Sequence, residues 1–167
     1  MSEPPGIPVT AEPNRATVRR EVRIARSADE VWAVVGDPSA LHTWFPGMSA
    51  STVDGTVRII TTDSGIPMPE QILTLDHLQR RFQYRLTAPM VRHHLGTIDV
   101  HDLGGDESLV VYATDAEPAA MAIIVGGSTG AALLELKRLL EAHQLEAGEP
   151  PSPSTEPGAT TEGQEHA

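Results

Sequence analysis

The chain has 167 residues and no cysteine, which excludes disulfides, thiolate metal sites and cysteine nucleophiles. Its net charge is -11, and residues 146–167 carry five glutamates without any lysine or arginine. Nucleic-acid binding is not expected, because neutralising phosphates requires a basic face.

Both ends of the chain have a composition typical of disorder. Residues 1–15 and 146–167 are rich in proline and glycine and poor in apolar residues, so we predict two disordered tails around one domain at 16–145. The start lacks a basic segment followed by an apolar run, and no stretch approaches the ~20 apolar residues of a membrane span. We therefore expect a cytoplasmic protein without a membrane span.

The first elements can be read from local signals. Val18, Val22 and Ile24 share one face of a strand at 17–24, with charged residues between them. Ser27 and Glu30 form a capping box, which predicts a short helix over 31–35. The Asp-Pro pair at 37–38 ends that helix and begins a second one.

The middle of the chain alternates between strands and turns. The Asp-Gly pair at 54–55 lies between two β-prone runs, 49–53 and 56–62, and predicts a tight hairpin. Short polar connections separate four further strands, predicted at 70–77, 81–87, 94–103 and 108–115. The pattern predicts an antiparallel meander.

A long amphipathic helix is predicted over 119–143, with apolar residues at helical spacing. The whole order of elements indicates an α+β fold, in which a curved antiparallel sheet of six to seven strands is covered by this helix on its concave face. A bent sheet cannot fill its concave face with its own side chains, so an internal cavity is expected. The small residues at 126–132 have three possible interpretations: a widened pocket, a kink at Gly126-Gly127, or close packing of the helix on the sheet.

Strand periodicity assigns several side chains to the inner face. Phe82, Tyr84 and Leu86 are expected to point inward, because the alternative buries Arg81 and Arg85. Periodicity cannot place Glu70, since apolar residues follow it on both faces of its strand.

The next strand contains the one histidine expected in a cavity. Ile98 and Val100 define its inner face, which turns His94 inward. His93, Asp99 and His101 are then expected to face water.

Several segments, taken together, resemble a known superfamily. They are Asp-Glu-Val-Trp-Ala-Val-Val-Gly-Asp-Pro at 29–38, Gly-Thr-Val-Arg at 55–58, Ser-Gly-Ile-Pro-Met at 64–68 and Glu-Gln-Ile-Leu at 70–73. Their order and spacing over 16–145 resemble the START-related helix-grip superfamily, which includes polyketide cyclases, the birch-pollen allergen and the plant abscisic-acid receptors. The resemblance implies a ligand pocket between sheet and helix, a gate at 64–68, and an inward orientation of Glu70.

Three residues are candidates for chemistry. An inward carboxylate, phenol and imidazole at Glu70, Tyr84 and His94 could orient a ligand or act as general acid and base. Each could equally satisfy a partner in the core, so no catalytic residue is assigned. We expect the ligand-binding pocket to be lined by residues of the sheet, the gate and the helices: Trp44, Ile66, Glu70, Ile72, Phe82, Tyr84, Leu86, His94, Ile98, Val100, Val125 and Thr129.

The two tryptophans and the histidines have simpler interpretations. Trp32 is expected to anchor its helix on the sheet, and Trp44 is either a second anchor or a ligand contact. Adjacent strand residues such as His93 and His94 point to opposite faces, so neither a metal nor another cofactor is expected.

These patterns lead to three functional hypotheses. The first is binding or transport of a small hydrophobic molecule, such as a lipid or polyketide, in the internal cavity. The second is a polyketide cyclase or aromatase-like enzyme, and the third is a protein-interaction module of chaperone-activator type. A free strand edge at 17–24 leaves a homodimer possible.

Overall fold

The computed structural model describes residues 14–148, so the expected tails lie almost entirely outside the described residues. One antiparallel sheet has the strand order β1-β7-β6-β5-β4-β3-β2, which confirms the predicted α+β class. The elements are, in chain order, β1 (Ala16–Ile24), α1 (Ala28–Val35), η1 (Pro38–Thr43, a 3-10 helix), β2 (Met48–Asp54), β3 (Val57–Thr62), β4 (Pro67–Asp76), β5 (Arg81–Leu86), β6 (His93–Gly104), β7 (Glu107–Glu117) and α2 (Ala119–Gly148).

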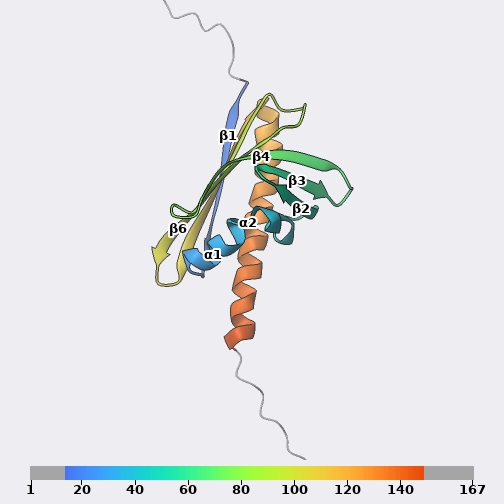
Figure 1. Ribbon diagram of the computed structural model, residues 1–167. Coiled ribbons are helices and arrows are strands. Elements are labelled where there is room, and N and C mark those ends of the chain that lie inside the picture. Colours follow the sequence, from blue (N-terminus) through green and yellow to red (C-terminus); the bar gives the residue numbers. More distant parts are fainter. Residues whose placement is uncertain (1–13, 149–167) are drawn as a thin grey trace, which may run out of the picture.

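The long helix α2 crosses the curved sheet and continues past it at its C-terminal end (Figure 1). It contacts β1 and β7 directly, while the strands from β6 to β2 bend away from it. β1 and β2 are the two edges of the sheet. This arrangement leaves space between the inner face of β3, β4 and β5 and the N-terminal half of α2.

The short helices begin where their caps predict. The Ser27 hydroxyl accepts a hydrogen bond from the backbone N–H of Glu30, and the Glu30 carboxylate accepts one from the N–H of Ser27, which confirms the capping box. The Asp37 carboxylate caps η1 by accepting from Ser39 N at 2.9 Å. Trp32 is buried and donates from Nε1 to Nδ1 of His77 at 3.1 Å, so it ties α1 to the turn between β4 and β5.

The β2–β3 hairpin turns one residue later than predicted. Asp54 pairs with Val57, so the two turn residues are Gly55 and Thr56. Gly55 has a φ of 57°, which glycine adopts without the steric cost that a side chain brings. The expected Asp-Gly turn is therefore a Gly-Thr turn that begins immediately after Asp54.

A bulge in β4 explains why periodicity could not place Glu70. Glu70 pairs with Leu86 and Ile72 pairs with Tyr84, but the register then shifts so that Leu75 pairs with Phe82. Directly opposed residues share a face of the sheet, and a bulge of one residue exchanges the two faces. Glu70 therefore points inward.

The helix α2 is continuous through its glycines and ends at Gly148 rather than at 143. At Gly126 a Cβ atom would come 2.5 Å from Cγ1 of Val18 on β1, whereas a Cβ at Gly127 would meet nothing within 4 Å. Arg20 also donates from Nε to the carbonyl of Gly126 at 3.2 Å. Of the three interpretations of the small residues at 126–132, close packing of the helix on the sheet is the one that applies to Gly126.

By length and composition alone, this helix is more apolar than the sequence analysis expects. Ala119–Ala142 reaches a mean hydropathy of 1.6 and is long and apolar enough to cross a membrane. In the structure this segment packs along β1 and β7, and Leu133 and Leu136 are buried in the core. The helix is thus part of a folded domain.

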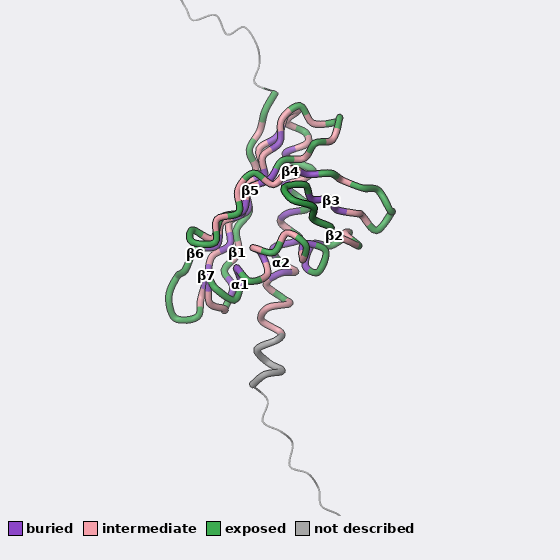
Figure 2. The backbone as a smooth tube through the Cα atoms, viewed as in Figure 1, coloured by how far each residue is buried: buried purple, intermediate pink, exposed green. Residues whose placement is uncertain are grey.

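Buried and accessible residues alternate along β6 and β7, as Figure 2 shows. His94 lies on the inner face with Ile98 and Val100, as the strand pattern predicts. The apolar core includes six side chains that are at most 2% exposed: Ile24, Ile98, Val100, Val110, Leu133 and Leu136.

Candidate ligand-binding site

A cavity of about 270 Å³ lies between the sheet and the N-terminal half of α2. Most of its wall is apolar, and it lies at the small end of the size range of small-molecule sites. The surrounding residues come from η1, the sheet, the β5–β6 connection and α2: Leu41, Phe45, Met48, Arg58, Ile60, Met68, Glu70, Tyr84, Leu86, Met90, Val91, Tyr112, Met121, Ile124, Val125 and Ser128.

Methionine is concentrated in this wall. Met48, Met68, Met90 and Met121 all line the cavity, and Met1 is the only other methionine of the chain. The unbranched, polarisable side chain of methionine adapts to irregular shapes. Such a wall can fit apolar molecules of more than one shape.

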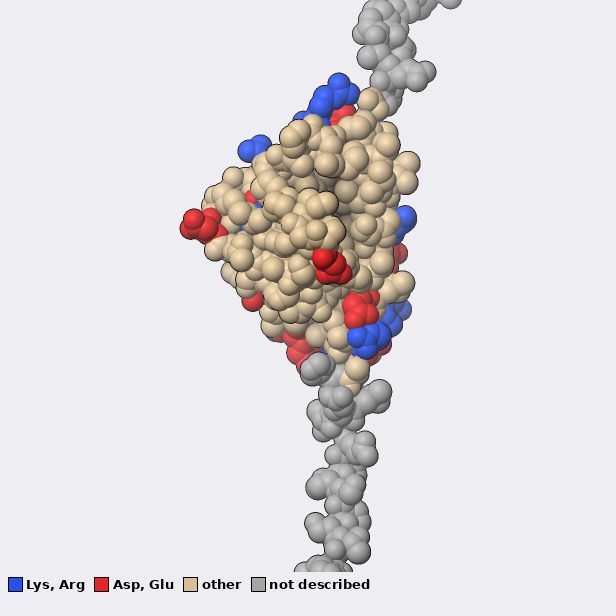
Figure 3. Space-filling view, turned by 90° about the vertical axis from the view of Figure 1, so that its right-hand side faces the viewer, with Lys and Arg blue, Asp and Glu red and all other residues tan. Residues whose placement is uncertain are grey.

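The surface around the β2–β3 side of the molecule is also poor in charge. In Figure 3 the charged side chains of this face gather mostly at its margins. Met90 and Ile124, which line the cavity, are 66% and 62% exposed at their outer side. An apolar molecule can therefore approach the cavity without desolvating charged side chains.

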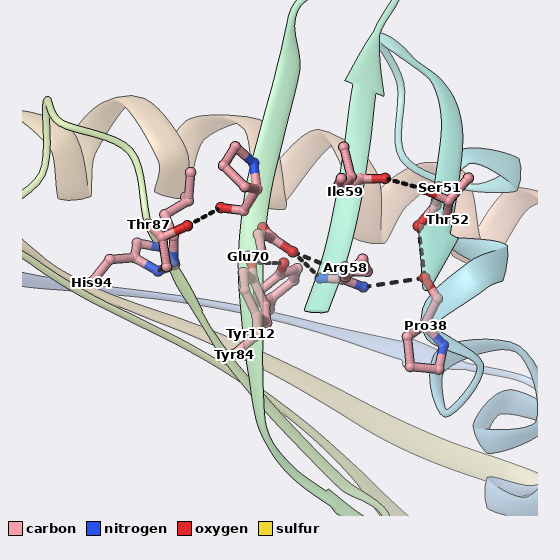
Figure 4. Close-up of polar contacts among 12 residues, drawn as sticks. Pro38, Ser51, Thr52, Arg58, Ile59, Glu70, Tyr84, Thr87, His94 and Tyr112 are labelled. Carbon is pink, nitrogen blue, oxygen red and sulfur yellow. Dashed lines mark hydrogen bonds and ion pairs between the residues drawn. The ribbon is translucent and has the colours of Figure 1, made fainter. Parts of the chain in front are cut away.

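One buried ion pair lies on the polar side of the cavity. Arg58 of β3 and Glu70 of β4 are direct cross-strand partners, and they are 1% and 3% exposed. Arg58 Nε donates to Glu70 Oε2 at 2.7 Å, and Nη2 lies 2.6 Å from the same oxygen. Figure 4 shows the pair beside the two tyrosines Tyr84 and Tyr112.

The environment of this pair is apolar and aromatic. The guanidinium of Arg58 lies over the rings of Phe82 and Tyr84, 4.8 Å from each centroid. Burial raises the pKa of Glu70, and the charge and hydrogen bond of Arg58 oppose that rise. Buried pairs of this kind seldom add net stability, because removing both charges from water costs more than their attraction returns.

Two tyrosine hydroxyls meet next to the ion pair. Tyr84 and Tyr112, both buried, share a short hydrogen bond between their hydroxyl oxygens. Burial raises the pKa of both phenols, so both remain protonated near neutral pH. A Cβ at Gly96 would overlap the ring of Tyr84, so this glycine leaves the space that the ring occupies.

His94 lies next to this cluster but not in the cavity wall. Its ring centroid is 5.5 Å from that of Tyr84, and its Nδ1 accepts a hydrogen bond from the backbone N–H of Leu86 at 3.1 Å. Burial, and secondarily the neighbouring His93, lowers the pKa of His94 to about 4. The pairing of β5 with β6 ends at Tyr84 and Gly96. Beyond that point, the hydrogen bond from Leu86 N–H to His94 connects the two strands.

The structure brings four of the expected pocket residues together in the cavity wall: Glu70, Tyr84, Leu86 and Val125. Phe82, Ile98 and Val100 are inward but belong to the packed core, and Ile72 packs against it. Thr129 is buried, and its hydroxyl donates to the carbonyl of Gly126 at 3.0 Å.

Trp44 lies in a different place from the other predicted residues. It borders a second hollow of about 400 Å³ between α1 and the C-terminal half of α2, together with Val34 and Leu136. Its neighbour Phe45 lines the main cavity, and the two ring centroids are 6.0 Å apart. Adjacent aromatic residues therefore border different hollows.

The expected gate at 64–68 forms a compact hairpin loop. Thr62 holds it, because its backbone N–H donates to the carbonyl of Ile66 and its hydroxyl accepts from the Ile66 N–H, both at 3.0 Å. Ile66 is 60% exposed and only Met68 of this segment reaches the cavity. Met90 and Val91 of the β5–β6 connection line the cavity at this end instead.

Sequence reasoning missed the most polar parts of the site. Arg58 was not identified because arginine is rarely buried, and only its pairing with Glu70 shows that it points inward. Tyr112 shares the inner face of β7 with Val110, so strand parity could have identified it. The methionines were not considered together, because they are far apart in the sequence.

The side chains described over residues 14–142 include no group of three histidines, aspartates or glutamates that could hold a metal ion. What the cavity does offer is a carboxylate, a guanidinium and two phenols at one side of an otherwise apolar space. These groups can accept a hydrogen bond from one polar group of a bound molecule and can also donate one to it.

Comparisons with known proteins agree with this architecture. An uncharacterised protein of Bacillus thuringiensis has 26% sequence identity and a TM-score of 0.70, covering 75% of this chain and 99% of its own. The Zhui aromatase/cyclase of a Streptomyces species has 22% identity and a TM-score of 0.66, covering 80% and 98%. Norcoclaurine synthase of Thalictrum flavum has 19% identity and a TM-score of 0.62, covering 78% and 96%. No curated protein matches the chain.

The fold and its cavity place the chain in the START-related helix-grip superfamily. More narrowly, residues 15–141 match the family described as "Polyketide cyclase / dehydrase and lipid transport", and the chain belongs to that family.

Proposed function

We propose that the protein binds a small apolar molecule in the cavity beneath the N-terminal half of α2. The observation that carries this proposal is the cavity itself, a space of about 270 Å³ whose wall is mostly apolar and contains four methionines. A cavity of this size is suited to a molecule of one or two rings or a short chain, rather than to a lipid with two long acyl chains.

Filling the cavity tests the proposal directly. Val125 lines the cavity on α2, so Val125→Trp should block binding, whereas Ile123→Trp on the exposed side of the same helix should not. Native mass spectrometry of the gently purified protein should show a bound small molecule in the unaltered chain and in Ile123→Trp. Equal retention of ligand in Val125→Trp would contradict binding at this site.

A second candidate function is cyclisation of a polyketide. It is favoured by the family and by the position of Glu70, Tyr84 and Tyr112 in the cavity wall, where protonated phenols and a carboxylate could move protons on a bound chain. Product analysis with a poly-β-ketone substrate separates the two functions. An enzyme should lose turnover in Tyr84→Phe while still binding product, and a carrier should show no turnover in either form.

The interaction-module hypothesis depends on a collapsed cavity. The open space beneath α2 gives that hypothesis no support.

A further inference from the structure

The charges at the cavity wall balance each other. Among the described residues that line it, Arg58 and Glu70 are the only charged side chains. Their ion pair is buried on both sides, so the cavity as a whole is neutral. A charged group of either sign on a ligand would therefore enter a buried space without a counter-charge, which is costly.

The guanidinium of Arg58 is largely committed to Glu70. Its Nε donates to Oε2 of Glu70, and its Nη1 donates to the carbonyl oxygen of Pro38 at 3.5 Å. Its Nη2 lies 2.6 Å from the same Oε2 as an ion-pair contact without a hydrogen bond. Its plane lies over the rings of Phe82 and Tyr84. A ligand carboxylate would have to displace Glu70 from Arg58 to obtain the bidentate contact that arginine normally offers.

Besides Nη2 of Arg58, two hydrogen-bonding groups of the cluster have no partner among the described side chains. Both contacts from Arg58 reach Oε2 of Glu70, which leaves Oε1 without a donor. The hydroxyls of Tyr84 and Tyr112 bond to each other, and since one of them donates, the other keeps its own proton. The site therefore presents one acceptor and one O–H donor side by side.

From this charge balance and these two free groups we infer that the ligand is an uncharged apolar molecule with a hydroxyl group at one end, and that the site rejects carboxylates. A hydroxyl matches both free groups, because it can donate to Oε1 of Glu70 and accept from the tyrosine O–H. The inference rests on the proposed function and adds the chemical class of the ligand.

Three probes that share one ring system test the inference. Naphthalene, 2-naphthol and 2-naphthoate differ only in the polar group, and near pH 7 the naphthol is neutral while the naphthoate is an anion (ordinary phenol and carboxyl pKa values are about 10 and about 4). Titration calorimetry should show 2-naphthol binding at least about tenfold more tightly than 2-naphthoate. Naphthalene should bind with intermediate affinity.

A charge-altering variant should reverse the preference. Glu70→Gln leaves the positive charge of Arg58 without its partner, so 2-naphthoate should bind this variant more tightly than 2-naphthol does and should raise its Tm. The double variant Arg58→Met with Glu70→Leu removes both charges and is expected to fold even if Glu70→Gln does not. It should bind naphthalene at least as well as 2-naphthol.

The possible outcomes separate the inference from the proposed function. If naphthalene binds the unaltered protein but not Val125→Trp, and 2-naphthoate binds as tightly as 2-naphthol, the cavity binds ligands and the inference about their class is wrong. If none of the three probes binds, the proposed function fails first. The preference for 2-naphthol together with its loss in the double variant would support the inference.

Discussion

The two halves of α2 cover different parts of the sheet. Beneath the C-terminal half, Ile24, Val110 and Leu136 belong to an apolar core, and the hollow beside Trp44 lies at the edge of this core. Beneath the N-terminal half, Arg58, Glu70 and two tyrosines border an open cavity. The first region contributes stability through burial, whereas the second holds polar groups at a cost in stability. The comparison indicates that the apolar core and the proposed ligand site lie under opposite halves of one helix.

The largest effect is expected from breaking the buried ion pair on one side only. Arg58→Met leaves the carboxyl group of Glu70 buried without its partner, and should lower the free energy of unfolding by about 3–5 kcal/mol. Adding Glu70→Leu to the same chain should restore stability to that of the unaltered protein or exceed it. Urea denaturation of both variants checks this, and a double variant less stable than Arg58→Met would contradict it.

A truncation in the apolar region should cost slightly less. Leu136→Ala removes a side chain that is 0% exposed, and should lower the free energy of unfolding by about 3 kcal/mol. Leu134→Ala is the matched control, because Leu134 is 65% exposed on the same helix and should change stability by less than about 0.5 kcal/mol. Similar losses in the two variants would show that α2 is not packed as described.

The third effect depends on pH. The pKa of His94 is lowered from its ordinary value of 6.5 to about 4 by burial. Between these two pH values the imidazole binds a proton in the unfolded chain but not in the folded chain. Its stabilising contribution is therefore present above pH 6.5 and is lost as pH falls toward 4, by about 2 kcal/mol between pH 7 and pH 5.

The variant His94→Gln isolates this effect. Glutamine can still accept from the N–H of Leu86 but does not titrate. Chemical denaturation at several pH values should show that the variant loses less stability than the unaltered protein between pH 7 and pH 5. Parallel profiles for the two proteins would contradict a buried neutral His94.

The smallest effects should distinguish two adjacent glycines. Gly126→Ala places a methyl group 2.5 Å from Cγ1 of Val18 and should destabilise the protein by about 1–2 kcal/mol. Gly127→Ala meets nothing within 4 Å and should stabilise it by up to about 1 kcal/mol through helix propensity. Thermal denaturation of the pair checks both signs, and a gain for Gly126→Ala would contradict close packing of α2 on β1.

The sequence predicts the apolar region much better than the cavity. Alternation in β5 and β6, the Ser27 capping box and the helical spacing in α2 are local signals, and each one is reproduced in the structure. The apolar region depends on little else, because burial of apolar side chains follows directly from these patterns.

The cavity depends on relations that a single segment does not contain. Arg58 is buried only because β3 pairs with β4 in a register that sets it opposite Glu70. The inward position of Glu70 in turn is hidden by a bulge between Ile72 and Thr74, which no local pattern indicates. The cavity wall also combines methionines from four separate segments of the chain.

The most direct test of the account is a crystal structure of the protein with 2-naphthol. The account predicts one molecule in the cavity beneath the N-terminal half of α2, with its hydroxyl within hydrogen-bond distance of Glu70 Oε1. A molecule bound instead in the hollow beside Trp44, or in the cavity with its hydroxyl turned away from Glu70 and the tyrosines, would contradict it.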